Sequence, residues 1–368
     1  MIIDIIAGAR PNFMKIAPII AAIETEKEAG KIIDYRLIHT GQHYDKNMSG
    51  SFFEELGIPD PHVNLECGGG TQAEQTAHIM IAFENELMTN PADLVLVVGD
   101  VTSTMACSIV AKKLLVKVAH VEAGIRSFDL SMPEEINRMV TDSITDYFFT
   151  TTTLANNNLK NYGAKDDQIF FVGNVMIDTL LKNMNRFKQP KVFNELELKP
   201  KEYFVITLHR PANVDEEGKL KRLMDEIINN VHGLPIIFPV HPRTSKILAG
   251  LGIGATNLQM IEPLGYLEFN YLVKNAKAVI TDSGGITEET TVMGIPCFTL
   301  RDNTERPETI TLGTNELIGT DPKAIKPALD KLFAGEWKKG GIPPLWDGKT
   351  SPRIISHLLA LSKEISGK

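Results

Sequence analysis

The chain has few cysteines, and they show no spacing that would indicate a disulfide framework or a zinc site. Its 368 residues include three cysteines, Cys67, Cys107 and Cys297, which lie far apart with no C-x-x-C pattern. Disulfide scaffolds and structural zinc sites use closely spaced cysteines. We therefore interpret all three as buried thiols of a reducing compartment, and we expect neither a disulfide nor a metal ligand among them.

Long apolar segments and an excess of positive charge are also missing. No apolar run reaches the roughly 20 residues that span a bilayer. The N-terminal MIIDIIAGARP is too short for the apolar core and cleavage site of a signal peptide. The cytoplasm is therefore the expected location. The net charge of −8 does not favour nucleic-acid binding, so neither a membrane nor a nucleic acid is an expected partner.

Several cofactor and catalytic motifs are missing as well. The first strand-like run is followed by GARPNF instead of G-x-G-x-x-G, so a dinucleotide cofactor is not indicated. The chain has no Walker lysine motif and no G-x-S-x-G nucleophile turn. His39 and His43 are spaced for one helix face, but the intervening glycine favours a loop, so we expect no metal site there. No cofactor is expected.

What the chain does have is a repeated alternation of apolar strand-like runs and amphipathic segments. This pattern is typical of parallel sheets covered by helices on both faces. A polar, proline-containing stretch over 183–202 interrupts it, and the length favours two domains. We expect an α/β protein with two Rossmann-like, doubly wound domains facing a central cleft. The predicted bounds are 1–182, 183–350, and a final helix over 351–368 that packs back on the first domain.

The segment TDSGGITEE, residues 281–289, predicts an anion site. An apolar run ends in Asp-Ser-Gly-Gly and turns directly into a helical pattern. Ser283, Gly284 and Gly285 would lie where a helix exposes unpaired N–H groups, which suits a phosphate or diphosphate. Glu289, about one turn further on, would reach the hydroxyls of an attached sugar. The alternative is an ordinary strand-to-helix turn.

Acidic side chains follow the strands of the first half. Asp100 and Glu122 each end an apolar run, and ligands bind at the carboxyl ends of the strands in an open α/β sheet. Glu134 and Glu135 follow a proline in MPEEINR, a typical helix start, where acids also occur for purely structural reasons. Arg138, one turn on, would pair with Glu134 or bind an anionic substrate.

Cationic side chains follow strand ends in both halves. They are Arg10, Lys15, His209, Arg210, His241, Arg243, Arg301 and Arg306. Arg306 would clamp a phosphate or carboxylate with two parallel hydrogen bonds, although the charges of RDNTERPE would equally form a self-satisfied surface network. These residues together predict an enzyme that binds a nucleotide-type diphosphate.

The motifs together resemble the non-hydrolysing UDP-N-acetylglucosamine 2-epimerases, in family order across nearly the whole chain. The matching segments are GARPNFMKIAP, HTGQHYD, VVGDVTST, HVEAGIRSFDLSMPEEINR, VGNVMIDT, TLHR, HPRT, IEPLGYLEF, TDSGGITEE and LRDNTERPET. The resemblance implies a fold of the glycosyltransferase-B type. It also implies interconversion of UDP-N-acetylglucosamine and UDP-N-acetylmannosamine, usually by a homodimer that needs no NAD.

The resemblance also implies roles for individual residues. The catalytic residues would be Asp100, Glu122, Glu134 and His209. The substrate-binding residues would be Arg10, Lys15, Arg138, His241, Phe269, Ser283, Gly284, Gly285, Glu289 and Arg306. Gln42, His43 and Arg210 are candidate regulatory residues. The chain departs from the family pattern at Pro211 and Ala212, where an acid is common, and at Leu264, where some members have Gln.

The implied chemistry needs acid/base groups on both faces of sugar carbon 2. UDP leaves carbon 1 as the proton leaves carbon 2, which gives 2-acetamidoglucal. A proton then adds to the other face while UDP returns. One positioned acid or base contributes ~10²–10⁴-fold in rate. Burial or a neighbouring carboxylate would raise the pKa of such an acid toward neutrality, and cations would hold the departing diphosphate.

Four other functions remain open from the sequence. They are epimerisation of a UDP-2,3-diacetamido uronic acid, a hydrolysing epimerase that releases UDP and N-acetylmannosamine, a glycosyltransferase, and a catalytically silent nucleotide-sugar sensor. The segment DNTERPE favours the simple N-acetylglucosamine substrate, because the diacetamido relatives tend to alter its Arg-Pro pair. Retention of the acids and of His209 argues against a silent sensor.

Overall fold

A computed structural model describes residues 1–41, 53–214, 216–240, 245, 248 and 250–365. The chain divides into two compact units. One comprises Met1–Lys182 with Pro344–Lys368, and the other comprises Asn183–Pro343. All three cysteines are buried and free, as the sequence predicted. None of the described helices combines the length and the apolar character that crossing a bilayer requires.

The first unit is built on a parallel sheet of seven described strands, in the order β3-β2-β1-β4-β5-β6-β7. Its strands are β1 (Ile2–Ala7), β2 (Asp34–His39), β3 (Val63–Asn64), β4 (Leu94–Val98), β5 (Lys117–Val121), β6 (Tyr147–Thr150) and β7 (Ile169–Phe171). The direction of strand addition reverses between β1 and β4. Such a reversal opens a crevice at the carboxyl ends of the strands, where ligands bind in doubly wound sheets.

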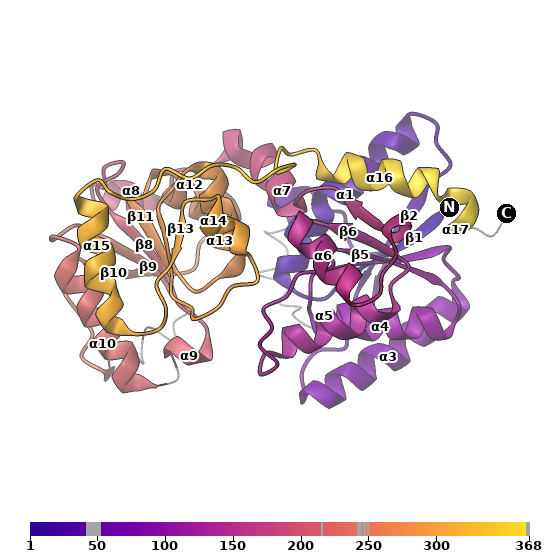
Figure 1. Ribbon diagram of the computed structural model, residues 1–368, viewed down its shortest axis with the longest axis horizontal. Helices are drawn as coiled ribbons and strands as arrows, with labels where there is room; N and C mark the ends of the chain where they lie inside the picture. The colour runs from indigo at the N-terminus through magenta and orange to yellow at the C-terminus, as the bar shows by residue number, and fades with distance from the viewer. Residues whose placement is uncertain (42–52, 215, 241–244, 246–247, 249, 366–368) are drawn as a thin grey trace. The chain divides into compact units, whose positions relative to one another are not determined.

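Helices cover both faces of this sheet (Figure 1). Helices α1 and α16 pack together on one face, and α3, α4 and α5 pack side by side on the other. This arrangement explains why β4, LVLVV, is apolar at every position and buried throughout. The helices of the unit are α1 (Arg10–Glu28), α3 (Gln72–Thr89), α4 (Thr102–Lys113), α5 (Pro133–Ile144), α6 (Thr153–Asn161), α7 (Val175–Asn183), α16 (Thr350–Ala360) and α17 (Ser362–Ile365), with a 3-10 turn at Asp166–Gln168.

The second unit repeats the topology with six described strands, in the order β10-β9-β8-β11-β12-β13. Its reversal lies between β8 and β11. The strands are β8 (Phe204–Thr207), β9 (Ile236–Pro239), β10 (Leu258–Ile261), β11 (Ala278–Thr281), β12 (Cys297–Thr299) and β13 (Asn315–Leu317). Every strand pair in both sheets is parallel. The prediction of two Rossmann-like, doubly wound sheets is therefore confirmed.

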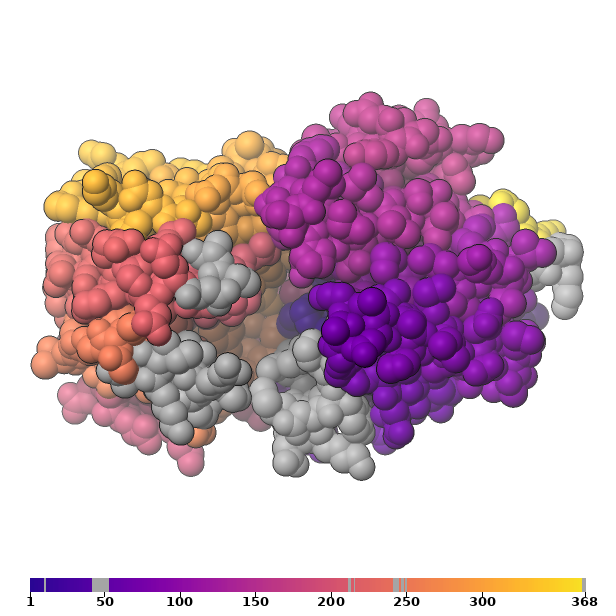
Figure 2. All heavy atoms as spheres, turned by 90° about the horizontal axis from the view of Figure 1, so that it is seen from below, coloured from indigo at the N-terminus to yellow at the C-terminus, as the bar shows by residue number. Residues whose placement is uncertain are grey.

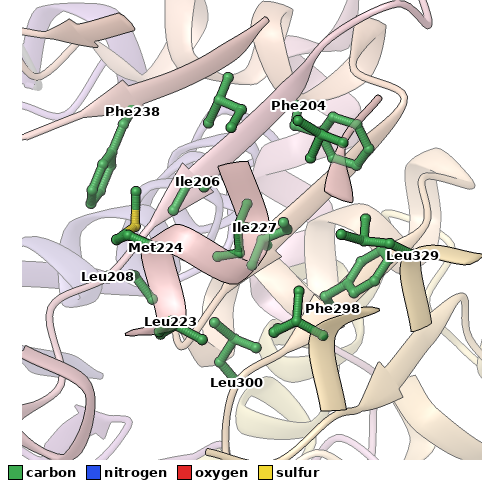
Figure 3. Close-up of a cluster of buried hydrophobic side chains, with 14 of the residues drawn as sticks. Phe204, Ile206, Leu208, Leu223, Met224, Ile227, Phe238, Phe298, Leu300 and Leu329 are labelled. Carbon is green, nitrogen blue, oxygen red and sulfur yellow. The ribbon is translucent and has the colours of Figure 1, made fainter. Parts of the chain in front are cut away.

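Side chains of β8 alternate between two apolar cores. Phe204 and Ile206 point into the core shown in Figure 3, where Met224 and Ile227 of α10 meet the sheet. Tyr203 and Val205 face the opposite core. The helical elements are α8 (Lys191–Glu195), α9 (Pro211–Val214), α10 (Glu217–Asn230), α12 (Tyr266–Asn275), α13 (Gly284–Met293), α14 (Pro307–Thr311) and α15 (Ile325–Phe333), with 3-10 turns at Met184–Arg186 and Pro322–Ala324.

Two segments have more structure than their sequence suggested. The polar stretch over 183–202 contains α8, and its Phe193 and Leu198 are buried in a core of the second unit. The segment GGGTQ, residues 68–72, whose three glycines are typical of a flexible loop, ends in a helix start. Thr71 accepts a hydrogen bond from the Glu74 N–H, and the Glu74 carboxylate accepts one from the Thr71 N–H. This reciprocal cap explains where α3 begins.

Near the chain's end, α16 is tied to the first unit through its N-terminus. The Asp178 carboxylate accepts hydrogen bonds from the backbone N–H groups of Thr350 and Ser351, at 3.0 and 2.6 Å. A carboxylate at the start of a helix satisfies its unpaired donors and complements its dipole. The last helical segments thereby complete the first unit instead of the second.

Candidate active site

In the first unit, the turn after β1 is closed by the side chain of Asn12. Its Oδ1 accepts hydrogen bonds from the backbone N–H groups of Gly8 and Ala9, both at 3.0 Å, and its Nδ2 donates to the Val98 carbonyl at the end of β4. Asn12 therefore joins the two strands that flank the switch point. A Cβ at Gly8 would lie 2.1 Å from the Ser103 hydroxyl oxygen, so the turn requires glycine.

Lys15 and Glu122 form a buried ion pair at this edge of the sheet. The Lys15 ammonium contacts the Glu122 carboxylate, and the two residues are 8% and 3% exposed. Glu122 has a φ of +70°, a backbone conformation that is costly for a residue with a Cβ and is concentrated at functional sites. A Cβ at Gly99 would lie 2.8 Å from the Lys15 nitrogen, so this glycine makes room for the pair.

Asp100, one residue beyond Gly99, pairs with Arg138 of α5. Its Oδ2 accepts from the Arg138 Nη2 at 2.6 Å and from the Nε at 3.0 Å. Asn137 donates from its side chain to the Asp100 carbonyl at 2.8 Å. Asp100 and Glu122 thus each contact a cationic side chain.

The two adjacent acids at the start of α5 differ in their surroundings. Glu135 is buried and accepts hydrogen bonds from the backbone N–H groups of Ser127 and Phe128, and it pairs with Arg138 at 2.5 Å. Glu134 is exposed in the first turn of the same helix. The sequence suggested Glu134 as a partner of Arg138, but the described partners of Arg138 are Glu135 and Asp100.

Beneath these acids lies a buried polar cluster that the sequence did not reveal. His120 of β5 places Nε2 2.8 Å from the Gly99 carbonyl oxygen and Nδ1 2.7 Å from Asp142. Asp142 also contacts Arg126 at 2.7 Å. Burial alone would raise the pKa of Asp142, but the charges and hydrogen bonds of His120 and Arg126 outweigh burial and lower it. The cluster supports the turns that carry Asp100 and Glu122.

In the second unit, the predicted glycine turn forms the start of α13. Ser283 is the N-cap, with no hydrogen bond from its side chain to the helix, and Gly284 and Gly285 are the first two helical residues. All three are partly exposed. The first N–H groups of a helix have no partner within it, so this turn presents donors and the positive end of the helix dipole to solvent.

Asp282 connects this turn to the end of β8. It is fully buried, and its carboxylate accepts from the backbone N–H groups of His209 and Arg210 and from the Asn213 side chain. Its Oδ1 lies 3.0 Å from the Nδ1 of His209, whose side chain is 61% exposed. Burial would raise the pKa of Asp282, but these partners, His209 first, lower it.

Glu289 is buried within α13 and is held by α12. Tyr266 donates its hydroxyl proton to Oε1 at 2.8 Å, and Asn270 lies 3.5 Å from the same atom. Burial raises the pKa of Glu289 to about 7, against the opposing effect of the two hydrogen bonds. Phe269, also on α12, is partly buried against the neighbouring apolar core.

The arginines after β12 are paired with acids. Arg306 is 7% exposed and its Nε lies 2.6 Å from the Glu288 carboxylate, while Arg301 lies 2.5 Å from Glu305. Arg210 approaches the same Glu305 at 3.8 Å and donates from Nε to the Asp282 carbonyl. The network alternative weighed from RDNTERPE is thus present. Whether Arg306 also binds a ligand stays a prediction.

Some predicted residues lie outside the described part of the chain. They are Gln42, His43, His241 and Arg243. Arg10 is the first residue of α1, but its side chain is not described either.

Comparison with known proteins places the chain in a family. The family model for UDP-N-acetylglucosamine 2-epimerase matches residues 25–359. A UDP-N-acetylglucosamine 2-epimerase of Methanocaldococcus jannaschii is 42% identical over 97% of this chain and 99% of its own length. The chain belongs to the UDP-N-acetylglucosamine 2-epimerase family.

Structural and further sequence comparisons agree. A crystal structure of the M. jannaschii enzyme in complex with UDP-GlcNAc and UDP superimposes with a TM-score of 0.88 at 41% identity, and the match covers 98% of this chain and all of that one. The fold is of the glycosyltransferase-B type. A Pseudomonas aeruginosa relative, 38% identical over 97% of this chain and 99% of its own length, is a UDP-2,3-diacetamido-2,3-dideoxy-D-glucuronate 2-epimerase.

Sequence reasoning missed the residues that hold the predicted ones in place. Asn12, Asp282, Tyr266 and Glu288 contact backbone or side chains of the candidate site. Only Asp282 carried a usable signal, because it ends an apolar strand in the same way as Asp100. The others lie within helical patterns, where nothing in the local sequence distinguishes a supporting polar residue from a solvent-exposed one.

Proposed function

We propose that this protein epimerises UDP-N-acetylglucosamine reversibly at carbon 2, through elimination of UDP to 2-acetamidoglucal and its return. The observation that carries the proposal is the full-length similarity to UDP-N-acetylglucosamine 2-epimerases together with two switch-point sites of different chemistry. One has acid–cation pairs, which suit proton transfer. The other has an open helix N-terminus, which suits a diphosphate.

In the first unit, Asp100, Glu122 and Glu134 serve carbon 2. Asp100 contacts Arg138 and Glu122 contacts Lys15, and these two carboxylates act as bases or stabilise positive charge at the sugar. Glu134 is exposed, so it is the one of the three acids best placed to exchange a proton with solvent. Lys15 and Arg138 also supply charge for an anionic substrate.

In the second unit, α13 holds the nucleotide. Its first N–H groups bind the diphosphate, Glu289 accepts hydrogen bonds from the ribose hydroxyls, and Arg306 adds positive charge. The exposed ring of His209 supports the departing diphosphate, because protonated imidazole offsets the negative charge that grows as the carbon 1–oxygen bond breaks. Gln42, His43, His241 and Arg210 remain candidate binding or regulatory residues on the family resemblance.

Incubation with UDP-N-acetylglucosamine in deuterated water tests this function. Both epimers should acquire deuterium at carbon 2 with no net loss of UDP-sugar. Free 2-acetamidoglucal and free UDP should be detectable only in small amounts, since both stay bound to the enzyme between elimination and re-addition. Absence of exchange would refute the proposal, and stoichiometric release of UDP with free N-acetylmannosamine would indicate a hydrolysing enzyme.

A UDP-2,3-diacetamido uronic acid is the second candidate substrate, favoured by the 38% identical P. aeruginosa relative. Measuring kcat/KM for both nucleotide sugars with the same preparation decides between them. We expect the N-acetylglucosamine nucleotide to be preferred, because the chain retains the Arg-Pro pair of DNTERPE that the diacetamido relatives tend to alter.

We further propose a cytoplasmic homodimer. Helix α3 lies on the surface of the first unit (Figure 2), and its Ile81 and Met88, two turns apart, are 61% and 66% exposed. Exposed apolar side chains on one helix face are typical of subunit contacts. Sedimentation should give a mass near twice that of the chain, and Ile81→Glu with Met88→Glu should halve it. Three buried free thiols suit a reducing compartment.

A further inference from the structure

The buried Asp282 joins the loop after β8, which carries His209 and Arg210, to the start of α13. It directly precedes Ser283, the N-cap of the helix, and its side chain is fully buried. The His209 ring beside it is largely exposed. One edge of the imidazole is thus held by a buried carboxylate while most of the ring remains open to a ligand.

The two oxygens of Asp282 face different sets of donors. Oδ2 accepts from the backbone N–H of Arg210 at 2.9 Å, from that of His209 at 3.1 Å, and from the Asn213 side chain at 3.1 Å. Oδ1 faces the Nδ1 of His209 at 3.0 Å and the His209 N–H at 3.3 Å. A carboxylate only accepts hydrogen bonds, so Nδ1 carries the proton of this contact. Proton gain and loss are left to Nε2.

We propose that Asp282 is the positioning residue of His209, which it fixes in the tautomer protonated at Nδ1 and stabilises as imidazolium when Nε2 takes up a proton. The inference rests on the proposed function, in which His209 supports the departing diphosphate. Asp282 also leads into the phosphate-binding turn, so one buried side chain aligns the histidine with the helix N-terminus. A carboxylate partner of this kind orients an imidazole and stabilises its charge without being protonated itself.

Substitution of Asp282 by Asn makes the proposal testable through the donor pattern. The amide oxygen will occupy the Oδ2 position, because three donors converge there. The amide nitrogen then occupies the Oδ1 position and donates to Nδ1, which must accept. The ring is forced into the tautomer protonated at Nε2, in which a proton cannot be gained at that atom.

The expected result for Asp282→Asn is a loss confined to turnover. We expect kcat to fall by ~10²–10⁴-fold, with KM and the Kd for UDP changed by less than about threefold. The ¹⁵N resonances of the His209 ring should change from the pattern of protonated Nδ1 to that of protonated Nε2. A merely structural role would alter thermal stability and substrate binding without changing the tautomer.

Two further variants sharpen the test. Asn213→Ala removes a different donor to the same carboxylate and should retain the wild-type tautomer with kcat within about threefold, since the contact between Asp282 and the His209 Nδ1 stays in place. In a His209→Ala background, Asp282→Asn should cause no further loss of kcat, because its effect acts through the ring.

Three outcomes would overturn the proposal. The first is that the ¹⁵N pattern of the His209 ring is unchanged in Asp282→Asn. The second is that Asp282→Asn lowers kcat as much in the His209→Ala background as in the wild type. The third is that the wild-type ring is protonated at Nε2 alone. The wild-type spectrum decides even if the variant fails to fold. If the wild-type protein does not exchange deuterium into UDP-N-acetylglucosamine, the proposed function fails, while the ¹⁵N measurements still test the Asp282–His209 pair.

Discussion

The two units place acids at the same topological position and use them differently. In the first unit, Asp100 and Glu122 follow β4 and β5 and contact the side chains of Arg138 and Lys15. In the second unit, Asp282 follows β11 and binds mainly backbone N–H groups and a histidine. An acid whose partners are other charged side chains is suited to react. An acid whose oxygens accept hydrogen bonds mainly from backbone N–H groups is suited to hold a loop in place.

The turns after β1 in the first unit and after β11 in the second also differ in their side-chain partners. In the first unit, the Asn12 side chain occupies the N–H groups of Gly8 and Ala9. In the second unit the Ser283 side chain makes no such cap, and the Ser283 N–H donates to the Thr281 hydroxyl oxygen at 3.0 Å. In the proposed function, the shared topology places both ligand sites at the switch points, and the side-chain partners assign the anion to the second unit and the chemistry to the first.

Replacement of the Asp100 carboxylate by an amide is the strongest test of the proposed division of roles between the two units. Asp100→Asn should lower kcat by about 10³-fold or more, since a reacting carboxylate is lost, while the Kd for UDP changes little. Arg138 keeps a partner in Glu135, so the variant should fold. Turnover followed by NMR and UDP binding followed by calorimetry give the two values. Normal turnover would overturn the division of labour between the units.

The adjacent acids of α5 provide a matched pair. Glu134→Gln should reduce kcat by ~10²-fold with no change in melting temperature, because the side chain is exposed. Glu135→Gln should instead cost about 2 kcal/mol of stability, because a buried, charge-assisted contact with Arg138 is lost. Turnover and thermal unfolding of both variants separate these effects. A reversal of the two phenotypes would identify Glu135 as the reacting acid.

The raised pKa of Glu289 predicts that UDP binding to the second unit depends on pH. We expect no such dependence from the acids of the first unit. The pKa of Glu289 is raised to about 7, and in the proposed function its ionised form accepts hydrogen bonds from both ribose hydroxyls. UDP affinity of the wild type should therefore rise as pH increases through 7. Glu289→Gln should bind UDP about tenfold more weakly at pH 8 and lack this rise. Because both proteins share the ionisation of UDP itself, the difference between their calorimetric titrations isolates Glu289.

The same shift predicts an effect on stability with a defined sign. The folded-state pKa of about 7 exceeds the ordinary 4.5, so the folded state binds more protons between these values and loses stability as pH rises through them. The full effect above pH 7 is about 3 kcal/mol. Glu289→Gln should remove this dependence, so that its unfolding free energy exceeds that of the wild type more at pH 8 than at pH 5. Equal pH profiles would contradict the burial argument.

The smallest expected effect compares the two turns directly. Ser283→Ala should leave stability unchanged within about 0.5 kcal/mol, because the hydroxyl caps nothing, and should weaken UDP binding about two- to tenfold. Asn12→Ala, the matched change in the first unit, should cost about 2 kcal/mol of stability with little effect on UDP binding. Similar effects of the two changes on stability would contradict the view that the Asn12 side chain stabilises its turn and the Ser283 side chain does not.

Local sequence was sufficient for the strands and for the acids that follow them. Apolar runs such as LVLVV predicted β4, and the residues that end such runs lie at the switch points. It was insufficient for the partners of those residues. Arg138 is four residues from Glu134 and three from Glu135, and both spacings permit an ion pair on a helix. Only the packing of α5 decided which acid is buried beside the arginine.

The sequence alone determined the α/β class, the two repeated sheets and the helix start at Ser283, because these depend on hydrophobic period and on glycine at a turn. Its ordered motifs also identified the family. Only the tertiary structure decided that Lys15 pairs with Glu122, 107 residues away, and that Asp282 binds His209. Pairing between distant residues depends on burial and on competing donors, and neither is encoded in the local pattern.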